Sequence, residues 1–206
     1  MKGAIFDLDG VIVDTAKYHY LAWKELAEEL GFFFAEKDNE RLKGVSRMQS
    51  LEILLEVGGI VATQSEIEKM AESKNTRYVE MLQDIDKGEL LEGAEDYLKK
   101  LKSEGVKISL GSASKNAPLI LDKLGINELF DAIVDGNSVS KAKPDPEVFL
   151  KAAQLLKLAP EDCCVFEDSQ AGIEAAHRAG CEVIAIDKGG VLNGADKYVK
   201  CLGDLL

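Results

Sequence analysis

Short apolar runs alternate with helical stretches over most of the chain. Residues 4–6 form an apolar run that is too short for a helix, so it predicts a buried strand. Four later runs predict further strands at residues 106–110, 132–134, 164–166 and 182–186. Between them, helical patterns cover residues 94–103, a stretch ending at Leu124, a stretch opening at Pro146 behind an Asp145 cap, and residues 171–179. Strands that alternate with helices are typical of βαβ units.

Residues 15–84 carry a different pattern. They predict helices at residues 16–30, 38–43, 47–56 and 65–82, and they contain no alternating run of the kind that half-buried strands show. Ser46 is the predicted N-cap of the third helix, and residues 65–68 resemble a capping box that opens the fourth. We therefore expect an all-helical segment inserted directly after the first strand.

Together these patterns predict an α/β fold with a Rossmann-like parallel sheet, helices on both of its faces, and an inserted all-helical cap. The predicted α/β core comprises residues 1–14 and 85–206, and the predicted cap comprises residues 15–84. The last stretch, residues 189–206, is weakly patterned, and no element is assigned to it.

Composition narrows the possible partners. The 206 residues are 46% hydrophobic and carry a formal net charge of −12, which argues against nucleic acid as a partner. An anionic substrate would have to be captured by local cations, because the global field repels it. No apolar run is long enough to span a bilayer, and the N-terminus lacks a signal-peptide pattern. The four cysteines show no CxxC spacing, so we expect reduced thiols and a cytoplasmic location. We also expect a monomer without a membrane partner.

Every predicted strand is followed by a polar residue. These residues are Asp7, Ser112, Asp135, Glu167 with Asp168, and Asp187. The carboxyl ends of parallel strands lie at one edge of a sheet, which is where ligands bind in open α/β folds. The sequence therefore predicts a binding site at that edge, beneath the helical insertion.

Several carboxylates at one edge repel one another and favour a bound cation. Oxygen-only ligands indicate Mg²⁺, and no His or Cys cluster suggests zinc. We expect Asp7, Glu167 and Asp168 to surround the metal ion, some of them through water. The hydroxyl of Ser112 and the amine of Lys143 oppose these carboxylates, and together the groups describe a phosphoryl-transfer site with an aspartate nucleophile.

Electrostatics explains why such a site needs all of these groups. A carboxylate that attacks a phosphate is repelled by about 4 kcal/mol per pair of unit charges at about 4 Å and an effective dielectric near 20. Mg²⁺ and Lys143 offset this repulsion. Asp9 must differ from Asp7, because the leaving oxygen needs a proton donor; its pKa would have to rise roughly three units, which only a closed, dry site supplies. The helical insertion is therefore predicted to act as a lid that excludes water.

Four motifs in this order resemble those of the haloacid dehalogenase superfamily. They are Asp7-Leu8-Asp9-Gly10-Val11, Ser112-Ala113-Ser114, Lys143-Pro144 and Glu167-Asp168. The resemblance spans nearly the whole chain, and the helical insertion stands where that superfamily carries a helical cap. It implies that Asp7 is the nucleophile, that Asp9 is the general acid and base and also lends a backbone oxygen to Mg²⁺, and that Ser112 and Lys143 hold the transferring phosphate.

Further segments are similar to the sugar phosphomutases of that superfamily. They are Thr15, His19 and Trp23; Gly44-Val45-Ser46-Arg47; Ser73-Lys74-Asn75; and Ser112-Ala113-Ser114-Lys115-Asn116. This likeness implies that the substrate is bound by Thr15, His19, Trp23, Gly44, Val45, Ser46, Arg47, Lys74, Ser112, Ala113, Ser114, Lys115 and Asn116, with Arg47, Ser114, Lys115 and Asn116 on its second, non-reacting phosphate. It also implies that His19 and Lys74 link cap closure to the position of Asp9. Without the resemblance, His19 would be assigned to packing and Lys74 to a solvated helix face.

The expected substrate is thus a small sugar phosphate. The expected reaction moves phosphate between C1 and C6 of β-glucose through a phosphoaspartate and a bisphosphate. A sugar-phosphate phosphatase is the nearest alternative, since its core chemistry would be the same. What separates the two is the second phosphate site, where Arg47 and Lys115 form the expected anchor. A phospho-acceptor signalling domain is a distant alternative, because such domains lack a helical insertion after the first strand.

Overall fold

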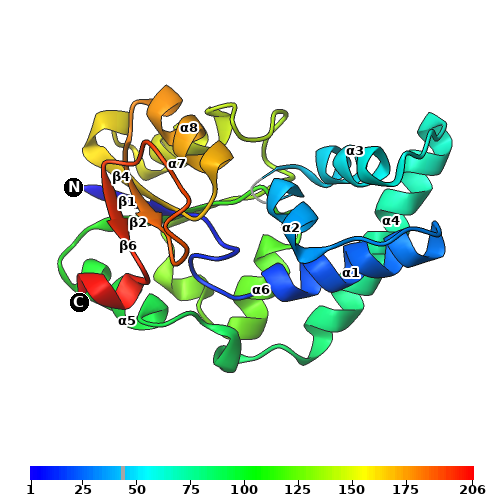
Figure 1. Ribbon diagram of the computed structural model, residues 1–206. Helices are drawn as coiled ribbons and strands as arrows, with labels where there is room; N and C mark the ends of the chain where they lie inside the picture. The colour runs from blue at the N-terminus through cyan, green and yellow to red at the C-terminus, as the bar shows by residue number, and fades with distance from the viewer. Residues whose placement is uncertain (43–44) are drawn as a thin grey trace.

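The computed structural model describes residues 1–42 and 45–206 (Figure 1). Its centre is a six-stranded sheet in the order β3-β2-β1-β4-β5-β6, in which all five neighbouring pairs are parallel. The strands are β1 (Gly3–Phe6), β2 (Lys107–Gly111), β3 (Ala132–Val134), β4 (Cys163–Glu167), β5 (Glu182–Ile186) and β6 (Lys197–Val199). The predicted α/β fold with a parallel sheet is confirmed.

Alternate residues of the central strand β1 face two separate cores. Ala4 and Phe6 pack into the larger core, and Ile5 packs into the smaller one on the opposite face, as the two-residue period of a strand requires. The larger core includes the buried sides of helices α5 (Ala94–Ser103) and α6 (Ala117–Leu124). The smaller core includes those of α7 (Glu147–Leu156) and α8 (Gln170–Ala179).

The sequence pattern did not reveal the sixth strand. β6 is three residues long, and two of them, Lys197 and Tyr198, are exposed, so it has no apolar run to detect. It pairs with β5 and is followed by a 3₁₀ turn, Leu202–Leu205, whose Leu202 is buried in the larger core. The predicted helix opening at Pro146 begins one residue later, at Glu147, whose backbone N–H donates to the Asp145 carboxylate at 3.1 Å.

Four helices gather beyond one end of the sheet (Figure 1). They are α1 (Ala16–Glu29), α2 (Glu36–Asn39), α3 (Arg47–Gly58) and α4 (Gln64–Met81). They share their own apolar cluster, which contains Trp23, Leu51 and Ala71. Short 3₁₀ turns follow α2, at Glu40–Leu42, and α4, at Leu82–Asp84.

Helix starts in this region follow side-chain capping, with one correction. Ser46 caps α3 as predicted, since its hydroxyl accepts from the Gln49 N–H at 3.3 Å. The capping box of α4 is not at residues 65–68 but two residues earlier, where Thr63 pairs with Glu66. Both Thr63 and Ser65 can cap a helix. Residues 60–62, ahead of Thr63, carry no helical pattern, so the sequence alone does not decide which of the two is the cap.

Two antiparallel linkers join the helical region to the sheet. The backbone N–H of Asp14 donates to the Glu89 carbonyl at 3.0 Å, and that of Leu91 donates to the Ile12 carbonyl at 2.9 Å. Val13 bridges to Leu90 between these two bonds. Since both connections run side by side, the helices approach the sheet from one direction and lie over the carboxyl ends of its strands (Figure 1).

Candidate active site

Asp7 stands directly after β1, at the edge of the sheet that faces the helices. Its backbone N–H donates to the Phe166 carbonyl at 2.9 Å and so continues the pairing with β4. Its side chain is buried, and Lys143 Nζ lies 2.6 Å from Asp7 Oδ1. Burial raises the pKa of Asp7 to about 6, although the Lys143 charge acts in the opposite direction.

Lys143 is held between two carboxylates. Its Nζ also lies 2.5 Å from Glu167 Oε1, and the Lys143 side chain is fully buried. Burial alone would lower its pKa, but Asp7 and Glu167 hold it above the usual lysine value. Lys143 therefore stays charged next to the predicted nucleophile.

Glu167 is fixed by the chain that follows it. Its Oε2 accepts from the backbone N–H groups of Asp168 and Ser169 and from the Ser169 hydroxyl, each at 2.9 Å. Gly172 in α8 permits this approach, because a Cβ there would overlap the Glu167 carboxylate. Glu167 thus orients Lys143, and its role as a direct metal ligand stays a prediction.

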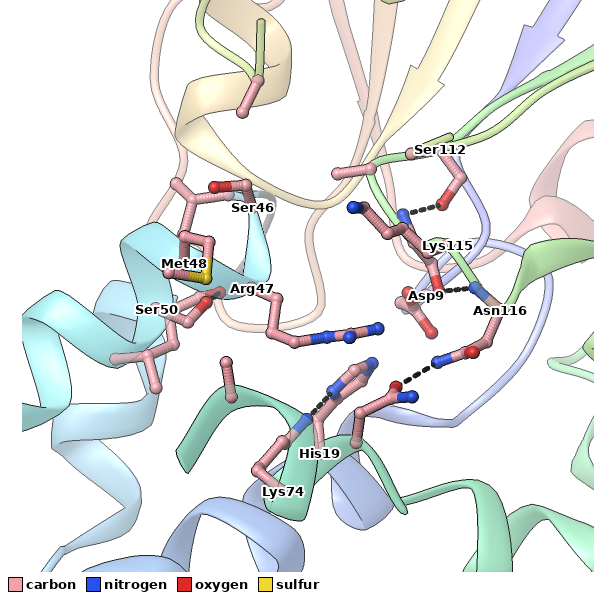
Figure 2. A pocket seen from close by; sticks show the side chains of 18 of the residues that line it. Asp9, His19, Ser46, Arg47, Met48, Ser50, Lys74, Ser112, Lys115 and Asn116 are labelled. Carbon is pink, nitrogen blue, oxygen red and sulfur yellow. Dashed lines mark hydrogen bonds between the residues drawn. The ribbon is translucent and has the colours of Figure 1, made fainter. Parts of the chain in front are cut away.

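The loop after β2 is folded by its own hydroxyl groups (Figure 2). Ser112 Oγ accepts from the Ser114 N–H at 3.1 Å, and Ser114 Oγ accepts from the Asn116 N–H at 3.3 Å. From the neighbouring turn, Asn137 Nδ2 donates to the Lys115 carbonyl at 3.1 Å. The loop therefore presents its serines, lysine and asparagine toward one cavity in a fixed backbone conformation.

Asp9 lies one step beyond Asp7, and its side chain is turned toward the cap. The Thr15 hydroxyl, fully buried at the start of α1, donates to Asp9 Oδ1. Burial and the neighbouring Asp7 charge raise the pKa of Asp9 to about 7. A carboxyl with this pKa can both donate and accept a proton near neutral pH, which general acid–base catalysis requires.

Lys74 is not the solvated charge that its sequence context alone indicates. It is 2% exposed, and its Nζ lies 2.7 Å from His19 Nδ1, 4.4 Å from the Trp23 ring centroid and 4.8 Å from that of Tyr78. Burial, assisted by the Arg47 charge, lowers the pKa of Lys74 to about 7. Burial and Lys74 likewise lower the pKa of His19 well below its usual value, so a neutral imidazole can accept from Lys74.

These groups meet around one cavity of about 590 Å³ between the helices and the sheet edge. Of the predicted site residues, those that line it are Asp7, Asp9, His19, Trp23, Val45, Ser46, Arg47, Lys74, Ser112, Ala113, Ser114, Lys115, Asn116 and Asp168. Figure 2 shows Arg47 reaching inward from the start of α3, opposite Lys115. Gly44 lies outside the described residues.

Three of the predicted residues lie behind the cavity wall. Thr15 contacts Asp9, while Lys143 and Glu167 form a chain to Asp7, and none of the three lines the cavity. Thr15 and Lys143 therefore act on the site through the carboxylates of Asp9 and Asp7, and Glu167 acts on it through Lys143.

The cavity also includes residues that were not predicted. They are Ala16, Asn39, Leu42, Met48, Ser50, Glu68, Ala71, Glu72, Asn75, Gly136, Val139, Ser140, Lys141 and Ala142. Tyr78 was missed as well; its ring stacks on His19 at 3.9 Å between centroids. The one available signal was spacing, since Ala71, Lys74 and Tyr78 share a face of α4 at intervals of three and four residues.

The edge of the sheet fits a divalent metal ion. Gly10 has φ +81°, and a Cβ there would overlap the Asp168 carboxylate, so Asp168 rests against the backbone that follows Asp9. Within the described part of the chain, no three His, Cys, Asp or Glu side chains gather closely enough to hold an ion by themselves. Two carboxylates, Asp7 and Asp168, with the Asp9 carbonyl oxygen and water are a donor set that a hard cation accepts.

The comparisons with known proteins agree with this fold and site. A family model for haloacid dehalogenase-like hydrolases matches residues 1–180, and the chain belongs to that family. A β-phosphoglucomutase of Bacillus subtilis is 45% identical over 207 residues, covering 100% of this chain and 92% of that protein. A crystal structure of β-phosphoglucomutase from Clostridium difficile superposes with a TM-score of 0.95 at 41% identity, covering 100% of this chain and 93% of that one.

A relative named for a different activity is also similar. A phosphorylated carbohydrates phosphatase of Thermotoga maritima is 33% identical over 187 residues, which cover 89% of this chain and 84% of that protein. The resemblance to the haloacid dehalogenase superfamily is thus confirmed, and the phospho-acceptor alternative is set aside. No helix in the described ranges is long and apolar enough to cross a membrane.

Proposed function

We propose that this chain is a β-phosphoglucomutase, which interconverts β-D-glucose 1-phosphate and glucose 6-phosphate through β-glucose 1,6-bisphosphate. The observation that carries the proposal is one cavity lined both by Asp7 and by two cations from opposite walls, Arg47 and Lys115. A mutase must hold a bisphosphate in either of two orientations, so it needs an anchor for the phosphate that does not react. The likeness to β-phosphoglucomutases over the full chain supports the same activity.

One proposed half-reaction transfers a phosphoryl group from β-glucose 1,6-bisphosphate to Asp7 and leaves glucose 6-phosphate. A carboxylate oxygen of Asp7 forms the new bond to phosphorus while the bond from phosphorus to the sugar oxygen breaks. Asp9, protonated near neutral pH, gives its proton to that leaving oxygen. Ser112, from the loop after β2, donates to the transferring phosphate, and Lys143 holds Asp7 in place by its 2.6 Å ion pair.

The half-reaction that precedes it runs in the opposite sense, from phosphorylated Asp7 to the free C6 hydroxyl of β-glucose 1-phosphate, and forms the bisphosphate. Asp9, in its ionised form, takes the proton of that hydroxyl, whose oxygen forms a bond to phosphorus as the phosphoaspartate bond breaks. Between the two halves the bisphosphate must turn around, and Arg47, Lys115 and Asn116 alternately hold whichever phosphate does not react. The cap over the cavity keeps water from the phosphoaspartate.

We infer that the metal ion is Mg²⁺, held by the Asp7 and Asp168 carboxylates and the Asp9 carbonyl oxygen. Oxygen donors with only two carboxylates suit Mg²⁺, which retains several waters and binds substrate phosphate. Its chemistry at this site is to neutralise charge on the transferring phosphoryl group. The activity should therefore be lost in EDTA and return with added Mg²⁺. A cytoplasmic location and a monomeric state remain predictions.

Supplying β-glucose 1-phosphate, Mg²⁺ and a trace of β-glucose 1,6-bisphosphate tests the proposed activity. We expect glucose 6-phosphate to form, with inorganic phosphate as a minor product. Inorganic phosphate as the sole product would instead identify a sugar-phosphate phosphatase, in line with the name of the Thermotoga maritima relative, a phosphorylated carbohydrates phosphatase. The same assay with α-glucose 1-phosphate is the control that tests whether the reaction is specific for the β anomer.

A further inference from the structure

One hydrogen bond crosses the cavity and joins the cap to the phosphate loop, which is the loop of residues 112–116 after β2. Asn116 Nδ2, in the loop after β2, donates to Asn75 Oδ1, in α4, at 2.9 Å (Figure 2). Both residues line the cavity. Contacts such as the hydrogen bond from Tyr18 to Glu89, by contrast, lie next to the linkers. The Asn75–Asn116 pair therefore connects the two parts of the molecule where the cap can open.

Each side of this pair is fixed by its own part of the molecule. On the core side, the Ser114 hydroxyl holds the Asn116 N–H at 3.3 Å, and Asn137 holds the neighbouring carbonyl at 3.1 Å. On the cap side, Asn75 follows Lys74, whose side chain is buried and bonded to His19. One turn of α4 thus carries both the contact to His19 and the contact to the phosphate loop.

The chemistry of the two amides allows this bond to persist when substrate is bound. A primary amide has two N–H donors, so Asn116 can give one to Asn75 and keep the other for a phosphate oxygen. We propose that Asn75 is a positioning residue that latches the closed cap to the phosphate loop and so favours phosphoryl transfer to sugar over transfer to water. This inference rests on the proposed mutase function.

Replacing Asn75 by leucine tests the latch. Asn75→Leu keeps the number and branching of the side-chain heavy atoms but removes the acceptor, so the cap should open more often and admit water. We expect the ratio of glucose 6-phosphate to inorganic phosphate to fall by roughly threefold to tenfold, the effect of losing one neutral hydrogen bond. A matched control is Thr76→Val, on an exposed position of the same helix, which should leave the ratio unchanged.

Asn75→Asp separates a latch from a general loss of structure. The carboxylate keeps the acceptor for Asn116, so the product ratio should stay near that of the wild type. The added negative charge should raise KM, since it faces the phosphate. If Asn75 only supported the fold, the product ratio would instead fall to a similar extent in Asn75→Leu and in Asn75→Asp. In an Asn116→Leu background, Asn75→Leu should change the ratio no further, because the bond is already absent.

Cap opening can also be measured without turnover. Trp23 is the single tryptophan, lines the cavity and is 2% exposed, so acrylamide quenching of its fluorescence reports access to the cavity. Quenching should increase in Asn75→Leu and not in Asn75→Asp or Thr76→Val. Unchanged quenching in Asn75→Leu would overturn the latch, whichever products the wild type forms. A wild type that forms only inorganic phosphate would overturn the proposed function instead.

Discussion

The core and the cap each bury one lysine in the site, and the two lysines have opposite surroundings. Lys143, at the sheet edge, is paired with Asp7 and Glu167, and these carboxylates hold its pKa above the usual value. Lys74, in α4, lies against two aromatic rings and an imidazole nitrogen, and burial lowers its pKa to about 7. The core thus keeps a permanent charge beside the reacting group, whereas the cap supplies a lysine that readily loses its proton.

This contrast matches the work that each part has to do. Charge develops on the transferring phosphate at the sheet edge, so a fixed cation there is favourable throughout the reaction. In the proposed mechanism the cap opens and closes in each cycle, and a fully paired buried ion between cap and core would oppose its opening. A single neutral hydrogen bond between the two parts, such as that from Asn116 to Asn75, forms and breaks more easily.

The largest expected effect comes from Asp7→Asn. The amide cannot attack phosphorus, so kcat should fall by about a million-fold, as on removal of a nucleophile in other enzymes. The structure should persist, because an amide oxygen can still accept from Lys143. Turnover of β-glucose 1-phosphate and the mass of the phosphoenzyme are the measurements; appreciable residual turnover, or a phosphorylated variant, would remove Asp7 from the nucleophile role.

Lys143→Met should rank second and should affect both activity and stability. It leaves Asp7 and Glu167 buried and uncompensated, so the free energy of unfolding should fall by about 3–5 kcal/mol. Turnover should fall by about a thousand-fold or more, through the misplaced nucleophile. Urea unfolding and the coupled assay measure these effects. Equal stability of variant and wild type would contradict the pairing seen at the sheet edge.

Lys74→Met is the matched substitution in the cap, and it should separate activity from stability. Methionine can occupy the same space against Trp23 and Tyr78, so near pH 7 the free energy of unfolding should fall by no more than about 1.5 kcal/mol. Since His19 loses its partner and Asp9 is then less well placed, kcat should fall by about a hundred-fold. If Lys74→Met lowered the free energy of unfolding as much as Lys143→Met, the proposed difference between the two lysines would be wrong.

The pH dependence of stability should distinguish the same two residues. The pKa of Lys74 is about 7 in the folded chain against a usual value of 10.5. Between these values the unfolded chain binds a proton that the folded chain has released, so the free energy of unfolding rises with pH across this window. The difference between wild type and Lys74→Met, from urea titrations at several pH values, should show this rise. A flat difference would mean that Lys74 keeps its proton in the fold.

The two regions also differed in how far the sequence predicted them. At the sheet edge, Asp7, Ser112 and Glu167 could be placed together, because each follows an apolar run and parallel strands end at one edge. In the cap, helices were predictable, but their relative packing was not. Lys74 could be assigned a role only by resemblance, since a lysine in a helix is normally solvated and only the packing of α1 on α4 buries this one.

Two further features could not be predicted from the sequence, for similar reasons. Strand β6 carries two exposed residues out of three, so it forms only because β5 offers an open edge. Asn75 lies in a segment that the resemblance covered, yet nothing in the sequence indicates that its amide meets Asn116, which is 41 positions away. Contacts between the two parts depend on how the linkers orient the cap, and local patterns carry no such information.

Arg47→Ala should have a smaller effect, confined to binding. Arg47 lines the cavity from the first turn of α3, and it is proposed to hold the phosphate that does not react. Losing one charge-assisted contact should raise KM by roughly tenfold to a hundred-fold. Arg41→Ala removes the same charge from an exposed ion pair with Glu56 and is the control that should leave KM unchanged. An equal rise in both variants would assign the effect to net charge alone.

The smallest effect tests how the core holds its lysine in place. Glu147, at the start of α7, accepts from the Ser140 N–H at 3.0 Å and the Lys141 N–H at 2.8 Å through one carboxylate oxygen, and its other oxygen accepts from Lys151 at 2.6 Å. The hydrogen bonds from Lys151 and Ser140 lower the pKa of Glu147 to about 2. Glu147 therefore clamps, at any physiological pH, the loop that leads to Lys143.

Glu147→Ala removes this clamp, while Glu147→Gln keeps an acceptor oxygen for the two backbone N–H groups. We expect kcat to fall by roughly threefold to tenfold in the alanine variant, and the glutamine variant to recover most of the loss. KM should change little, because Glu147 does not line the cavity around the site. If the clamp orients Lys143, Glu147→Ala combined with Lys143→Met should be no slower than Lys143→Met alone. Additive losses would mean that the core lysine is positioned by Asp7 and Glu167 alone, and the rigidity of the core site would then reside in its ion pairs rather than in its loops.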